Sequence, residues 1–130
     1  MNQLKTIMHD FTFQNPVRVH FGHEKLGLLG NELKQFGKRV LLTYGGGSIK
    51  KIGLYDRVVA AVKEAGLELF ELGGIDPNPR IASVREGARL CKEHHIDVLL
   101  AVGGGSTIDC TKWIAAAACV AHDAWDFCDY

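Results

Sequence analysis

Two glycine-rich segments carry the residue types in this sequence that could do chemistry. Residues 103–106 and residues 45–48 both read Gly-Gly-Gly-Ser, and each follows a short apolar run. Consecutive glycines permit positive φ and let backbone N–H groups approach a ligand closely. Where such a turn opens a helix, unpaired N–H donors and the helix dipole favour a phosphate. The pattern therefore predicts anion binding, with a phosphate at residues 103–106 and a second anionic or ribose group at residues 45–48.

Each turn also has a structural explanation without a ligand. Ser106 can donate its hydroxyl to a phosphate, and Ser106 or Thr107 can cap the helix that follows. A tight strand–helix turn is the alternative there, although three glycines exceed what a turn needs. Lys50 and Lys51 follow the other turn and favour an anionic ligand. A flexible surface loop explains residues 45–51 equally well.

Two common phosphate motifs are absent. The GxGxxG/A fingerprint needs glycine or alanine in its sixth place, where Ile108 and Lys50 stand instead. The GxxxxGK[ST] motif is also missing, because Lys50 follows Ile49 and not a glycine. The sequence therefore excludes a P-loop ATPase and the common Rossmann fingerprint.

Apolar runs at residues 39–43, 67–72 and 97–102 alternate with segments of helical periodicity. The helical positions on one face are Leu54, Val58, Val59 and Val62 in one segment, and Ile81, Val84, Ala88 and Cys91 in the next. This alternation predicts an α/β fold, Rossmann-like, with a mainly parallel sheet and helices on both faces. Fully apolar runs are typical of strands buried on both sides. In such a sheet, ligands bind at the carboxyl ends of the strands.

The flanking segments predict further elements. Residues 11–13 and 17–21 form a strand pair, an N-terminal β-hairpin interrupted by Gln14-Asn15-Pro16. A helix over residues 24–36 follows, with Gly37 as its C-cap. The last helix starts near Thr107, and residues 120–130 show no clear element.

Composition limits the class of protein. The 130 residues are 47% hydrophobic, and their 15 basic and 15 acidic side chains cancel. A balanced charge gives no reason to expect nucleic acid or an anionic membrane as partner. The sequence contains no signal peptide and no apolar run of about 20 residues, so a cytoplasmic protein is expected. The cysteines include no CxxC pair and are expected to be free thiols; they are Cys91, Cys110, Cys119 and Cys128.

Several motifs together resemble one family. Gly-Gly-Gly-Ser-x-x-Asp-x-x-Lys at residues 103–112 is similar to the signature of the iron-containing (type III) alcohol dehydrogenases. Pro-Val-Arg-Val-His-Phe-Gly at 16–22 resembles the opening strand of that family. Three further segments resemble its butanol dehydrogenase branch, and they are YGGGSIKK followed by GLYD at 44–56, GIDPNP at 74–79 and Trp125-Asp126.

The resemblance implies roles for individual residues. It implies that Gly104, Gly105 and Ser106 hold the pyrophosphate of the coenzyme, and that Asp109 and Lys112 line the coenzyme cleft. Asn78 matches a position that contacts the adenosine part, and Gly46, Gly47 and Ser48 match the turn beside the adenine ribose. At Gly45, relatives restricted to NAD carry an acidic residue that repels a 2′-phosphate. Its absence here implies that NADP is tolerated as well as NAD.

The resemblance also implies an architecture and an activity. Residues 1–130 match the N-terminal dinucleotide-binding domain, and a helical C-terminal domain of the family is missing from the sequence. That domain holds a divalent metal, iron or zinc, through one aspartate and three histidines. The nearest local substitutes are His94, His95, His122, Asp123 and Asp126, and they are interpreted as solvated surface residues because metal sites need converging ligands.

The implied reaction is hydride transfer between NAD(P)H and a short-chain alcohol or aldehyde, such as butanol or butyraldehyde. The isolated 130 residues are expected to be inactive, and a homodimer through the N-terminal strands is expected. Two other classes stay open: a kinase or transferase module that binds ATP or a sugar phosphate, and a non-catalytic nucleotide sensor. The kinase interpretation lacks a carboxylate pair for magnesium beyond Asp109.

Overall fold

The computed structural model describes residues 10–128 as an α/β fold built on three parallel strands. The strands are β1 (Arg39–Tyr44), β2 (Glu68–Leu72) and β3 (Val98–Val102), in the order β2-β1-β3. In register, Val40 of β1 lies opposite Leu69 of β2 and Val98 of β3. The three strands and the parallel sheet predicted from the apolar runs are therefore confirmed.

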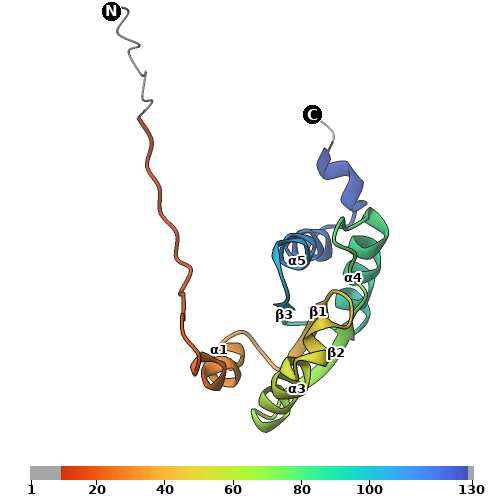
Figure 1. Cartoon of the computed structure of the whole chain (residues 1–130). Helices are drawn as coiled ribbons and strands as arrows, with labels where there is room; N and C mark the ends of the chain where they lie inside the picture. The colour runs from red at the N-terminus through yellow and green to blue at the C-terminus, as the bar shows by residue number, and fades with distance from the viewer. Residues whose placement is uncertain (1–9, 129–130) are drawn as a thin grey trace, which may run out of the picture.

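Helices cover both faces of the sheet, as predicted (Figure 1). The helices α4 (Ile81–Glu93) and α5 (Gly105–Ala118) pack on one face with the 3-10 helix η2 (Ala124–Cys128). The helices α1 (Leu29–Lys34) and α3 (Leu54–Glu64) pack on the other face, with the 3-10 helix η1 (Lys25–Leu28) beside α1. A short helix, α2 (Ser48–Lys51), follows β1.

Burial differs between the central strand and its neighbours. From Val40 to Thr43, β1 is fully buried, because it has a strand on each side and helices above and below. The strands β2 and β3 are half-buried over most of their length. The expectation of burial on both sides therefore holds for β1, whereas β2 and β3 form the edges of the described sheet and keep one side open.

The N-terminal β-hairpin prediction is wrong for this structure. Residues 10–21 contain no strand and run as an extended segment away from α1 (Figure 1). Two-residue alternation alone does not make a strand, because each strand needs a partner for its N–H and C=O groups. The exposed apolar side chains of the segment are Phe11, Phe13, Val17, Val19 and Phe21.

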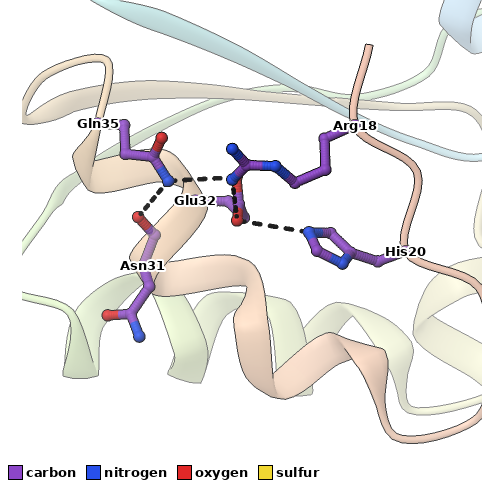
Figure 2. A network of polar contacts seen from close by, with 5 residues as sticks. All are labelled: Arg18, His20, Asn31, Glu32 and Gln35. Atoms are coloured by element: carbon purple, nitrogen blue, oxygen red, sulfur yellow. Dashed lines mark hydrogen bonds and ion pairs between the residues drawn. The ribbon is translucent and has the colours of Figure 1, made fainter.

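One cluster of polar contacts ties this segment to α1 (Figure 2). The Arg18 guanidinium donates to both carboxylate oxygens of Glu32, at 3.0 and 3.2 Å. The His20 ring lies 3.4 Å from the same carboxylate. Hydrogen bonding to Arg18 holds the pKa of Glu32 below its usual range. The pair is solvent-exposed and therefore anchors the segment only weakly.

The helix predicted over residues 24–36 is shorter than expected. It consists of η1 and the single α-helix α1, which ends at Lys34, so Gly37 is not its C-cap. Gly37 instead lies at φ +144, where the chain turns against Asp97 before entering β1. The elements α2 and η2, which are four and five residues long, were not predicted from the sequence.

Two further findings concern membrane helices and the cysteine thiols. Within residues 10–128, no helix combines the length and the apolar character that a membrane crossing requires. All four cysteines are free thiols, as expected. Burial raises the pKa of Cys91 to about 11 and raises the pKa of Cys110 as well. These two thiols therefore stay protonated at neutral pH and are not candidate nucleophiles.

Candidate nucleotide-binding site

The two glycine turns lie side by side at the carboxyl edge of the sheet. Tyr44 and Val102 are register partners on adjacent strands, so residues 45–48 and 103–106 leave the sheet at the same level. The chain passes from β1 to β2 on one side, and then crosses to β3 on the other side of β1. This is a topological switch point, where open α/β sheets hold their ligands.

The turn at residues 103–106 opens directly into the 14-residue helix α5. Gly104 is the N-cap residue, so no side chain covers the first N–H groups of the helix. Ser106 and Thr107 lie inside the first turn, and the prediction that one of them caps α5 is wrong. Cβ atoms added at Gly104 and Gly105 would meet nothing within 4 Å. The start of a long helix, with its unpaired backbone donors, is therefore not covered by other side chains at Gly104 and Gly105.

The Ser106 hydroxyl makes a contact that the sequence did not reveal. It donates a hydrogen bond to the carbonyl oxygen of Pro77, in the loop between β2 and α4. This bond brings the loop that contains Asn78 next to the turn expected to bind the diphosphate. Asn78 itself is exposed. The structure thus places two residues of the predicted site, Ser106 and Asn78, on adjoining segments.

The turn at residues 45–48 is braced by the chain that leaves β2. The N–H of Gly74 donates to the Gly45 carbonyl at 2.8 Å, and the N–H of Ile75 donates to the Tyr44 carbonyl at 3.2 Å. A Cβ at Gly45 would lie 3.3 Å from the Ile75 carbonyl oxygen, which is a tight contact. Gly46, Gly47 and Ser48 are exposed. A side chain at position 45 would crowd the hydrogen-bonded segment of Gly74 and Ile75, whereas side chains at positions 46 and 47 would meet no neighbouring atoms.

An aromatic cluster stands beside this first turn. The Lys50 ammonium lies 5.3 Å from the centre of the Tyr44 ring and 4.8 Å from that of Tyr55. The two rings meet edge to face, with centroids 5.6 Å apart. Hydrogen bonding to Glu71, together with burial, raises the pKa of Tyr55 to about 12. The turn is therefore flanked by a neutral phenol and by a cation resting on aromatic faces.

The structure places Asp109 and Lys112 on the exposed side of α5. Asp109 lines a hollow of about 220 Å³ together with Pro79, Trp113 and Trp125. Lys112 lines a different hollow with Trp113, Ala116 and Phe127. Asp109 therefore adjoins the loop that contains Asn78, while Lys112 lies apart from it.

Among the alternative metal ligands that the sequence offers, His122 lies 3.6 Å from Asp126, which is a pair and not a complete set. Within residues 10–128, no three histidine, cysteine, aspartate or glutamate side chains gather as metal ligands. The Asp123 carboxylate is bound by the Arg85 guanidinium at 2.6 and 2.9 Å, which holds the pKa of Asp123 below its usual range. The His94 ring stacks on Phe70. The iron of the resembled family therefore has no set of ligands in the described part of the chain.

Three buried threonines were missed by the sequence analysis as site residues. Thr43, Thr107 and Thr111 lie beneath the two turns, and each is less than one-tenth exposed. The spacing of Thr107 and Thr111, four residues apart on one helix, is the signal that could have paired them. The hydrogen bond between Thr111 and Thr43 depends on how the helix packs on the strand, which no local sequence pattern predicts.

Comparison with known proteins gives the family of this switch-point site. The family model of the iron-containing alcohol dehydrogenases matches residues 16–129. The chain therefore belongs to the iron-containing alcohol dehydrogenase family, as the motifs indicated.

Among curated relatives, the chain is 56% identical over 119 residues to a probable NADH-dependent butanol dehydrogenase 2 of Bacillus subtilis. It is 48% identical to NADH-dependent butanol dehydrogenase A of Clostridium acetobutylicum and 44% identical to an NADPH-dependent aldehyde reductase of Escherichia coli. These matches cover 92%, 92% and 85% of the chain, but 30%, 31% and 28% of the relatives. The chain thus spans less than a third of their length.

A solved structure agrees with this assignment. The chain superposes on NADH-dependent butanol dehydrogenase A from Thermotoga maritima with a TM-score of 0.87 and 42% identity. The match covers 92% of this chain and 30% of that one. The three-stranded parallel sheet with its helices is therefore the fold found in the corresponding part of that dehydrogenase.

Proposed function

We propose that residues 1–130 are the N-terminal dinucleotide-binding domain of a two-domain alcohol dehydrogenase or aldehyde reductase. The proposed reaction moves a hydride between NAD(P)H and a short-chain alcohol or aldehyde, such as butanol or butyraldehyde. The observation that carries the proposal is the pairing of two glycine turns at the switch point between β1 and β3. The turn that opens α5 supplies backbone donors and a helix dipole for a diphosphate.

Each proposed contact follows from the position of the residue. The N–H groups at Gly104, Gly105 and Ser106 lie at the start of α5, where the helix supplies no backbone acceptor for them, and we assign them to the diphosphate. The turn of Gly45, Gly46, Gly47 and Ser48 lies beside them and is assigned to the adenine ribose, with Asn78 at the adenosine part. Asp109 and Lys112 are assigned to the rest of the coenzyme cleft. The contribution of this domain is to bind and orient the coenzyme.

We propose that the domain accepts NADPH as well as NADH. The absence of an acidic side chain at Gly45 leaves a 2′-phosphate unopposed there, and Lys50 and Lys51 lie on the helix that follows. The relatives with 46–56% identity are named for NADH, whereas the relative at 44% is named for NADPH. NADH is therefore the first coenzyme to test.

Fluorescence titration of the chain with NADH, NADPH and ATP tests both proposals. Saturable binding of NADH, with NADPH bound as well and ATP bound more weakly, supports them. Tight NADH binding without measurable NADPH binding refutes the NADPH proposal alone. If ATP binds and neither nicotinamide coenzyme does, the dehydrogenase assignment is wrong and the kinase or transferase interpretation replaces it. A nucleotide sensor is distinguished by NADH binding in a complete protein that oxidises no coenzyme.

The substrate and the metal are proposed to be held outside this domain. Because residues 10–128 offer no converging metal ligands, we derive no catalytic step through iron. A bound divalent metal, iron or zinc, would supply Lewis-acid polarisation of the alcohol or carbonyl oxygen. The 130 residues alone are expected to oxidise no NAD(P)H with butyraldehyde, even with added iron or zinc. Metal-dependent turnover by the chain alone would contradict the two-domain proposal.

We also propose that the protein forms a homodimer through residues 17–21. Phe21 is 94% exposed and Val19 is 78% exposed, and they alternate with Arg18 and His20, which contact α1. A second copy paired along this segment would supply the strand partner that the single chain lacks. Sedimentation equilibrium tests this proposal. A dimer that Val19→Lys weakens supports it, and a monomer at all concentrations contradicts it.

A further inference from the structure

The three buried threonines need an explanation that packing does not give. Thr43 is 0% exposed, Thr107 5% and Thr111 7%, and they are the buried polar side chains of residues 10–128. Valine has nearly the same shape as threonine and fills a core without a hydroxyl that must be hydrogen-bonded. The hydroxyls of Thr43 and Thr111 make specific bonds that an apolar core does not require.

The hydroxyls of Thr43 and Thr111 form a directed chain. The Thr111 hydroxyl donates to the Thr107 carbonyl oxygen at 2.6 Å, and its oxygen lies 2.6 Å from the Thr43 hydroxyl. A hydroxyl has one proton to donate. Because Thr111 gives its proton to Thr107, Thr43 must donate to Thr111. The contact of Thr43 with the Leu100 carbonyl at 3.5 Å is the longer one. The chain thus runs from β1 to the first turn of α5.

The side chain of Thr107 lies at the junction of the two glycine turns. Its hydroxyl oxygen is 2.8 Å from the point that a Cβ on Gly103 would occupy. It is 3.7 Å from the corresponding point on Gly45. The Thr107 side chain therefore borders both turns. Its carbonyl accepts the Thr111 hydroxyl within α5, and the bond between Thr111 and Thr43 links α5 to β1.

We propose that Thr43, Thr111 and Thr107 are positioning residues for the coenzyme. Through this hydroxyl chain, the central strand fixes the height and rotation of α5, and with them the spacing between the two turns. A dinucleotide bridges both turns only when that spacing matches its length, so a shift of α5 weakens both ends together. None of the three residues is assigned a contact with the reacting atoms. The inference rests on the proposed function and adds residues that the coenzyme does not need to touch.

Two pairs of substitutions separate the hydroxyl from the shape of the side chain. Thr111→Val and Thr43→Val keep the shape and remove the link, whereas Thr111→Ser and Thr43→Ser keep the hydroxyl. Thr12→Val, on the exposed segment before α1, is the matched control. We expect each buried valine variant to weaken NADH binding by about tenfold, by analogy with metal sites, where loss of a hydrogen bond that orients a ligand weakens binding by about 10- to 100-fold. The serine variants should stay within about twofold of the unsubstituted chain.

Amide hydrogen exchange gives a readout that does not depend on the coenzyme. In Thr111→Val and Thr43→Val, amides of residues 45–48 and 103–106 should exchange faster together, while those of Leu41 and Leu42 keep their protection. If the unsubstituted chain binds no NADH, the proposed function fails, and the exchange pattern still decides the positioning role. Should Thr111→Val not fold, Thr43→Val carries the same test.

Three results would overturn the inference. The first is unchanged NADH affinity in both folded valine variants, even with a lower melting temperature, because the threonines would then serve stability alone. The second is equal loss in the serine and valine variants, because the serine variants keep the hydroxyl and the effect would then not depend on the hydroxyl link. The third is exchange that rises in one turn only, which would show that the two turns are not linked through Thr107.

Discussion

The same four residues, Gly-Gly-Gly-Ser, follow two adjacent strands, yet the helices that begin at the two copies differ in length. The helix α2 begins at Ser48 and lasts four residues, whereas α5 begins at Gly105 and lasts fourteen. Gly53 adopts a left-handed φ of +75, a conformation that glycine adopts without strain, directly after α2. The residues that follow α5's first turn instead pack on α4. The segment downstream of the tetrapeptide, and not the tetrapeptide itself, sets the length of the helix that follows each turn, and we therefore propose that the turn before α5 is the stronger anion site.

The difference has an electrostatic consequence. The field at a helix N-terminus grows as peptide dipoles align, and a single turn aligns few of them. The turn before α5 is therefore suited to a doubly charged diphosphate. The turn before α2 is suited to a ribose, with Lys50 and Lys51 supplying charge from side chains. Substitutions in each helix and each turn can test this division between the two turns.

The largest expected effect is on the helix behind the stronger turn. Ile114 of α5 is fully buried in the core cluster beneath β1 and lies against Gly87 of α4. Ile114→Ala should lower the free energy of unfolding by about 2–5 kcal/mol. Ile49→Ala in α2 should lower it by less, because Ile49 is buried outside the two core clusters. Urea unfolding measures both, and equal losses would show that the two helices are held equally firmly.

The second effect separates coenzyme affinity between the turns. Gly104→Val places a side chain at the N-cap of α5, where the added Cβ itself meets nothing within 4 Å and the side chain competes with a ligand for that space. Loss of hydrogen bonds to a charged ligand costs about 1.5–3 kcal/mol, or roughly 10- to 100-fold in NADH affinity. Gly46→Val, equally open, should weaken binding by only a few-fold. If Gly46→Val has the greater effect in the titration, the roles of the two turns are reversed.

The third effect concerns the amino ends of the strands, on the side of the sheet away from the two glycine turns, where no ligand is proposed. The Asp97 carboxylate accepts hydrogen bonds from the backbone N–H groups of Lys38 and Arg39, at 2.8 and 3.0 Å. These bonds, the one from Arg39 foremost, hold the pKa of Asp97 below its usual range. A carboxyl whose pKa is lowered on folding stabilises the fold above its unfolded pKa of about 3.9, and that stability is lost as the pH falls through the folded value.

Asp97→Asn tests this pH dependence against the unsubstituted chain. The stability difference between the two should be present at pH 6 and should shrink steadily as the pH falls below about 4. Thermal unfolding across this range provides the measurement. NADH affinity at neutral pH should stay unchanged, because both turns lie at the carboxyl ends of the strands and Asp97 lies at their amino ends. A loss of affinity in the folded variant would show that the two edges are coupled.

The smallest expected effect is on coenzyme preference. Lys50 lies on the faces of Tyr44 and Tyr55 beside the turn assigned to the ribose. Lys50→Gln should weaken NADPH binding by no more than about fivefold, since exposed charge pairs contribute roughly 0.2–1 kcal/mol, and should leave NADH binding unchanged. Lys63→Gln, in the last turn of α3, is the control. An equal effect on both coenzymes would remove Lys50 from the recognition of the 2′-phosphate.

Much of the fold was predictable because its signals are local. The runs at residues 39–43, 67–72 and 97–102 gave three strands, since apolar runs bounded by glycine are typical of a parallel sheet. The face of Val58 and Val62 likewise gave α3. The N-terminal hairpin was predicted wrongly, because alternation at residues 11–21 indicates a strand only when a partner is present.

The candidate site was predictable in its turns but not in its supports. The glycines and Ser106 stand out in sequence because they depart from ordinary turn composition. The bond from Ser106 to Pro77 and the chain from Thr43 to Thr111 join residues 29 and 68 positions apart. Such contacts follow from strand order and helix packing, which no single segment encodes. The coenzyme-binding roles themselves remain predictions.

The most direct test of the account follows backbone amide resonances of the ¹⁵N-labelled chain during titration with NADH. The account predicts the largest shifts at Gly104, Gly105 and Ser106, smaller ones at residues 45–48, and none near Asp97. Saturable NADH binding whose largest shifts lie away from residues 103–106 would contradict the claim that α5 holds the diphosphate.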